Sequence, residues 1–134
     1  MVEESSNNSQ EKPLLTFNSL YNILRTEKKS HTLQKFPDLF YEALDDFIQN
    51  KKSEIKRYKQ EKNQEKLKKE ELILKNTNNI VKELVALRTQ KIAKIATQNS
   101  LYDEKILEEE YILDKEKELY DSICKNIKNI QKFK

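Results

Sequence analysis

Few side chains in this 134-residue sequence could take part in acid–base, nucleophilic or metal chemistry. His31 is the only histidine and Cys124 the only cysteine. A histidine base, a catalytic triad or a Glu-x-x-His metal pair would depend on His31, and its nearest acidic neighbour in sequence is Glu27. We interpret His31 as part of a polar turn between helices. Cys124 lies among isoleucines and is interpreted as a small hydrophobic residue.

One acidic cluster could suggest a divalent metal, and it consists of Glu108, Glu109, Glu110 and Asp114. Consecutive residues of a helix point about 100° apart, so the three glutamates cannot all face one ion. Glycine is absent from the chain, which excludes phosphate-binding loops and dinucleotide fingerprints. The sequence therefore predicts no catalytic residues, no metal site, no cofactor and no enzymatic activity.

Composition indicates the fold class. Charged residues make up 37% of the chain, glycine is absent, and only two prolines occur. Tight β-hairpin turns need residues that accept positive φ, chiefly glycine and asparagine, whereas Leu, Ile, Glu and Lys favour helices. The expected fold is all-α, a bundle of four to five helices with a projecting, long antiparallel helical hairpin. We expect a soluble protein, because no apolar run is long enough to span a membrane.

Apolar residues at helical spacing locate the helices. The first begins after the N-cap Thr16 and runs to about Lys28, and the second runs from near Pro37 to about Arg57. A third begins near Glu70 and ends in the polar run 97–100, a helical piece lies within 101–112, and the last helix is capped by Asp114. The predicted boundaries are a disordered tail (1–14), a helical domain (15–131) and a tail or the start of a linker (132–134).

A basic segment occupies the expected hairpin. Residues 51–71 contain nine Lys or Arg against five Glu, although the net charge of the chain is only +3. The segment is interpreted as a solvated helix face or as a docking surface for nucleic acid or another polar partner. Interleaved glutamates argue against direct nucleic-acid binding. The candidate docking residues are Lys51, Lys52, Lys56, Arg57 and Lys59.

The last helix carries an apolar seam that is longer than packing within a small bundle requires. Its C-terminal part could contact another subunit, and two basic residues near the end of the third helix are candidates for the same surface. Arg88 either extends to solvent or pairs with an acid of the last helix or of a partner chain. The predicted interface residues are Tyr120, Ile123, Ile127, Ile130, Arg88 and Lys91.

The order of several local motifs resembles the helical domain of archaeal GINS subunits. The pattern Ser19-Leu20-Tyr21-x-Ile23-Leu24-x-x-Glu27-Lys28 is followed by Leu33-Gln34-Lys35-Phe36-Pro37-x-x-Phe40-Tyr41. After a long charged helix come Leu84-x-x-Leu87-Arg88-x-x-Lys91-Ile92-x-x-x-Ala96 and Leu113-Asp114-x-Glu116-x-Glu118-Leu119-Tyr120-x-x-Ile123. The resemblance is to the subunits whose helical domain comes first, and it spans about residues 16–131.

This resemblance implies a non-enzymatic scaffold in DNA replication. The family's subunits form an oligomer, in which a tetramer is expected, and bridge the MCM helicase to a RecJ-like protein in the cytoplasm at the replication fork. Direct DNA binding is expected to be weak or absent. The second, β-rich domain of such subunits is not expected in these residues. Two alternatives remain, a helical nucleic-acid-binding module that uses residues 51–71 and a generic helical adaptor.

Overall fold

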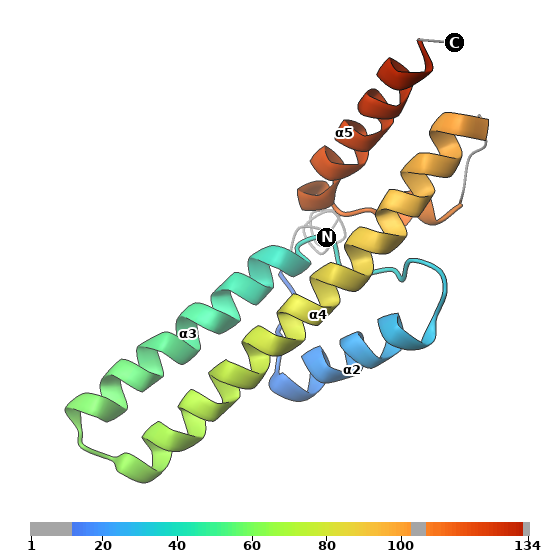
Figure 1. Cartoon of the computed structure of the whole chain (residues 1–134). Helices are drawn as coiled ribbons and strands as arrows, with labels where there is room; N and C mark the ends of the chain where they lie inside the picture. Colours follow the sequence, from blue (N-terminus) through green and yellow to red (C-terminus); the bar gives the residue numbers. More distant parts are fainter. Residues whose placement is uncertain (1–11, 103–106, 133–134) are drawn as a thin grey trace, which may run out of the picture. The chain divides into compact units, whose positions relative to one another are not determined.

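The computed structural model describes residues 12–102 and 107–132, and this part of the chain is helical without any strand (Figure 1). The all-α expectation is confirmed. None of the described helices combines the length and apolar character that crossing a bilayer requires. The elements are α2 (Phe17–Lys29), α3 (Phe40–Gln60), α4 (Gln64–Tyr102), the 3-10 helix η1 (Leu107–Tyr111) and α5 (Asp114–Gln131).

The first helix begins as the sequence predicts. The Thr16 hydroxyl accepts the backbone N–H of Ser19 at 3.1 Å, and the Ser19 hydroxyl accepts the backbone N–H of Thr16 at 2.8 Å. This reciprocal pair satisfies two backbone donors that the first turn of a helix otherwise leaves without partners. Thr16 is therefore the N-cap of α2.

Both predicted boundaries of the third helix are wrong. The third helix begins at Gln64 rather than near Glu70, and it continues through the polar run 97–100 to Tyr102. The Thr97 hydroxyl donates to the carbonyl of Ala93 at 2.7 Å, so it is satisfied inside the helix. Of the helical piece expected within 101–112, the structure has the 3-10 helix η1, and residues 103–106 lie outside the described part.

The cap of the last helix is also corrected. The N-cap of α5 is Leu113 rather than Asp114. Leucine has no side-chain acceptor, and the cap is instead made by Glu116, whose carboxylate accepts the Leu113 backbone N–H at 2.9 Å. Asp114 is exposed and lies 3.6 Å from the Lys117 ammonium group.

The chain divides into two compact units, of which unit 1 comprises Met1–Leu24 and Pro37–Glu83. In this unit α3 and the N-terminal half of α4 run antiparallel, side by side (Figure 1). The Lys51 ammonium group on α3 joins the Glu70 carboxylate on α4 at 3.1 Å. The buried apolar residues of unit 1 are Leu20, Leu24, Phe40, Ala43, Leu44 and Ile80.

Unit 2 comprises Arg25–Phe36 and Leu84–Lys134. Its core joins Leu33, Ile92, Ile95 and Ile112, against which Leu119 and Tyr120 of α5 pack. The C-terminal half of α4 and α5 run in the same direction, because Arg88 contacts Glu116 and Ala96 contacts Cys124 with the same sequence separation of 28. This parallel pair holds all six predicted interface residues.

Candidate functional site

The most elaborate polar arrangement in the described residues surrounds Arg88, inside unit 2. Its guanidinium is 1% exposed and makes a two-point contact with Glu116, through Nε at 2.7 Å and Nη2 at 2.9 Å. Nη1 donates to Glu27 Oε1 at 3.1 Å and to the carbonyl of Gln34 at 2.9 Å. Nη2 also donates to the carbonyl of Tyr111 at 3.1 Å. These five hydrogen bonds match the five donors that an arginine side chain has.

The ring of Phe36 completes the surroundings of the guanidinium. The centre of the guanidinium lies 4.1 Å from the ring centroid, and Phe36 is itself buried. A cation over an aromatic face is attracted by the ring quadrupole, and more strongly where water is excluded. Arg88 therefore contacts two carboxylates, two backbone carbonyls and one aromatic ring.

Glu27 is the second buried centre of this network. It is 0% exposed, and its carboxylate receives Arg88, the Lys91 ammonium group at 2.5 Å and the Gln34 backbone N–H at 3.4 Å. Lys91 also donates to the carbonyls of Glu27 at 2.7 Å and Thr32 at 3.0 Å. All three ammonium donors of Lys91 are thus used, and they link the end of α2 at Glu27 to Thr32 in the loop that follows.

Glu116 links the network to the start of α5, since the same carboxylate that holds Arg88 caps the Leu113 N–H. The network contains two cations and two carboxylates, so its formal charge is zero. Buried ion pairs persist only where geometry and further hydrogen bonds offset desolvation, and both conditions hold here. We call Arg88, Lys91, Glu27 and Glu116 the buried quartet.

These contacts decide between the two readings of Arg88. The guanidinium does not extend to solvent, and it pairs with an acid of the last helix, which was one of the alternatives. The expectation that Arg88 and Lys91 form part of a partner interface is corrected, because their donors are all used within unit 2. The quartet positions the loop after α2, α4 and α5, and leaves no free donor for a substrate.

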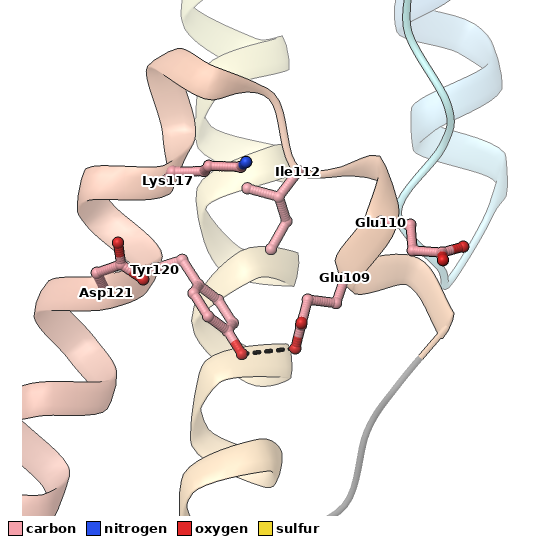
Figure 2. Close-up of a pocket in the computed structure, with 6 residues that line it drawn as sticks. All are labelled: Glu109, Glu110, Ile112, Lys117, Tyr120 and Asp121. Carbon is pink, nitrogen blue, oxygen red and sulfur yellow. Dashed lines mark hydrogen bonds between the residues drawn. The ribbon is translucent and has the colours of Figure 1, made fainter.

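A pocket of about 480 Å³ lies in unit 2, between η1 and α5 (Figure 2). Tyr120 enters it from α5, and its hydroxyl donates to the Glu109 carboxylate at 2.7 Å and accepts from the Asn99 side-chain amide at 2.9 Å. Burial raises the pKa of Tyr120 to about 12, and the Glu109 carboxylate acts in the same direction. The phenol therefore stays neutral near pH 7. The pocket is lined by Glu109, Glu110, Ile112, Lys117, Tyr120 and Asp121.

The remaining interface residues follow α5 outward. Ile123 and Ile127 are half-buried, whereas Ile130 is 69% exposed. Cys124 is half-buried, with its sulfur 3.8 Å from the carbonyl of Ala96. An apolar surface is thus available at the C-terminal end of α5, where the sequence places a contact with another subunit. That contact stays a prediction.

The predicted docking residues of α3 fall into two groups in unit 1. Lys51 contacts Glu70 and Glu54, and Arg57 lies 3.8 Å from Glu61 and donates to the Tyr58 hydroxyl at 3.0 Å. The hydrogen bond to Tyr58 raises the pKa of Arg57. The other group, Lys52, Lys56 and Lys59, is exposed and forms no ion pair in residues 12–102 and 107–132.

The remaining candidates for chemistry are His31 and the acidic cluster around Glu109. His31 is exposed in the bend after α2. Glu109 is engaged with Tyr120, and the side chain of Glu108 lies outside the described residues. No group of three His, Cys, Asp or Glu side chains in the described ranges could hold a metal ion.

Sequence reasoning missed Glu27 as a partner of Arg88 across 61 positions. No local signal in the sequence marks this pairing, because the acid that a buried arginine meets depends on how distant segments pack. Comparisons of the chain with family models, with curated proteins and with solved structures find no match.

Proposed function

We propose that this chain is a non-enzymatic subunit of a GINS-like DNA replication complex, which scaffolds the replicative helicase by contacting an MCM ring and a RecJ-like protein. The observation that carries the proposal is the convergence of the resembling motifs on Arg88. Those motifs supply Glu27, Gln34 and Phe36 from the N-terminal segments and Glu116 from the C-terminal one. Motif residues that are far apart in the sequence thus contact the same buried arginine.

The structural premise of the proposal is the bundle of four to five helices with a projecting antiparallel hairpin. In it the buried quartet fixes α5, and the exposed end of α5 at Ile127 and Ile130 contacts another subunit of a tetramer. A scaffold needs rigid, well-positioned surfaces more than reactive groups, and the saturated hydrogen bonds of Arg88 and Lys91 support rigidity. The proposal includes no cofactor and no catalysis.

The test is capture of the tagged chain from its native cells, followed by mass spectrometry. We expect the MCM helicase and a RecJ-like protein among the specifically recovered proteins, and an oligomer by light scattering of the purified chain. Recovery of neither protein by a folded, tagged chain would contradict the proposal. It would favour the generic adaptor.

A matched pair of variants sharpens the test on α5. The double change Ile127→Asp and Ile130→Asp places two charges in the expected contact, whereas Asn126→Asp and Asn129→Asp add the same charges at exposed positions of the same helix. Because an unpaired charge in an apolar interface is costly, the isoleucine variant should stay helical by circular dichroism and elute as a smaller species. The asparagine variant should keep the parent size. Equal behaviour of the two variants would place the contact elsewhere.

A further inference from the structure

The exposed lysines of α3 form a stripe that the sequence pattern conceals. A helix turns 100° per residue, so Lys52, Lys56 and Lys59 lie within about 60° of one another around the axis. Glu54 and Glu61, which are interleaved with them in sequence, fall on roughly the opposite side. Those two acids approach Lys51 and Arg57 instead. We call Lys52, Lys56 and Lys59 the lysine stripe.

Lys62 continues the lysine stripe into the turn between α3 and α4. The Lys62 N–H donates to the carbonyl of Lys59 at 3.2 Å, and the Asn63 N–H donates to the carbonyl of Tyr58 at 3.1 Å. This pair of hydrogen bonds is the Schellman arrangement, in which the residue at the position of Lys62 is left-handed and is usually glycine. Lys62 has φ 58° there. A lysine thus occupies a position that a glycine fits at lower conformational cost.

Side-chain contacts also hold the turn on the α4 side. The Asn63 side-chain oxygen accepts the backbone N–H of Lys66 at 3.2 Å and so caps α4. Two cations approach the ring of Tyr58, the Arg57 guanidinium at 4.8 Å and the Lys66 ammonium group at 5.8 Å from the ring centroid. Residues 52–69 hold eight basic and three acidic residues, and the turn presents this charge on a fixed backbone.

We propose that the lysine stripe and Lys62 bind the phosphate backbone of DNA, without reading its sequence. Charge complementarity carries the assignment, because four exposed ammonium groups on one continuous stretch of chain have no carboxylate partner in the described residues. Lysine is a point-charge phosphate ligand, and it is depleted at protein–protein interfaces. A DNA backbone is therefore favoured over an acidic protein.

The same residues offer no platform on which unpaired bases could stack. Tyr58 is the only aromatic residue in residues 52–69, and cations approach its ring, so no row of aromatic rings is available to stack bases. The contact should be of the weak, salt-dependent kind, with a dissociation constant of about 10⁻⁴–10⁻⁶ M at physiological salt. It goes beyond the proposed scaffold role and does not depend on it.

The test measures binding of a short fluorescein-labelled DNA duplex of mixed sequence by anisotropy, over a range of salt concentrations. In the parent protein, log K should fall linearly with log salt. Each phosphate contact contributes about 0.9 to that slope, so the triple variant Lys52→Gln, Lys56→Gln and Lys59→Gln should have a slope smaller by about 2.7. Its affinity at low salt should fall at least about tenfold.

A matched control removes the same charge from unit 2. The triple variant Lys125→Gln, Lys128→Gln and Lys132→Gln changes three exposed lysines of α5 or its C-terminal end, and it should change affinity by less than about threefold. If both triple variants lost the same DNA affinity, the effect would come from net charge alone, which would overturn the proposal. Absence of DNA binding by the parent would also overturn it, as would stronger lysine-stripe-dependent binding to poly-glutamate than to DNA.

Discussion

The buried quartet and the lysine stripe are made of similar side chains and have opposite chemistry. In the quartet, every donor of Arg88 and Lys91 meets an acceptor of the same unit, at 2.5–3.1 Å. In the lysine stripe, three ammonium groups of the same charge are exposed and have no carboxylate partner within residues 12–102 and 107–132. Charge type alone therefore does not indicate function, because burial determines whether a cation stabilises the fold or stays accessible to a partner.

The largest effect should come from removing the centre of the quartet. Arg88→Met leaves two buried carboxylates with only Lys91 as a cation, and breaking a buried ion pair from one side costs about 3–5 kcal/mol. The matched change Arg57→Met alters an exposed arginine paired with Glu61, and exposed pairs contribute about 1 kcal/mol or less. Urea unfolding followed by circular dichroism measures both. A loss below about 1 kcal/mol for Arg88→Met would show that the quartet does not stabilise the fold.

The second effect concerns α5 alone. Glu116→Gln keeps the shape of the side chain but removes its charge, and hydrogen bonds to charged groups contribute about 1.5–3 kcal/mol. We expect a stability loss in that range and faster amide hydrogen exchange at the start of α5. Glu118→Gln, an exposed change two residues away, should leave exchange unchanged. Uniform acceleration over the whole chain in Glu116→Gln would instead indicate global unfolding.

The sequence predicts the local features of the fold, but it predicts only part of the buried quartet. The all-α class follows from composition, and the cap at Thr16 follows from residue type, because both depend on local preferences. The pairing of Arg88 with the last helix was one of two readings, since a helical wheel gives a residue's face without its neighbours. Glu27 could not be assigned, because which acid a buried arginine meets depends on how distant segments pack.

The boundaries of α4 failed for a different reason. Apolar periodicity reports burial and not helicity, so a solvated helical start at Gln64 has no apolar signal before Leu67. The turn before it lies within the expected hairpin, but its exact position was not predicted, because the left-handed residue there is Lys62 and not a glycine. Asn63, a favoured capping residue, was the available signal.

A third prediction uses pH to probe the pocket between η1 and α5. Because burial raises the pKa of Tyr120 from 10.0 to about 12, the neutral phenol stabilises the fold fully below pH 10. Between pH 10 and 12 the unfolded chain releases this proton first, so the contribution is lost as pH rises. Tyr120→Phe should therefore lose about 1 kcal/mol at pH 8, and its deficit relative to the parent should shrink above pH 10. The exposed Tyr102→Phe should show neither effect. A deficit that is constant from pH 8 to 12 would contradict the prediction.

The smallest effect separates backbone from charge at the end of the lysine stripe. Lys62→Gly relieves the left-handed conformation that costs a non-glycine residue about 1–2 kcal/mol, but it adds backbone freedom to the unfolded chain, so the net gain should be about 0.5 kcal/mol. Lys62→Ala removes the same charge and keeps the steric cost, so it should not be more stable than the parent. Both variants should bind the DNA duplex with a salt slope smaller by about 0.9. If only Lys62→Gly weakened binding, backbone rigidity and not the ammonium group would be what Lys62 supplies. A glycine variant less stable than the alanine variant would contradict the left-handed conformation itself.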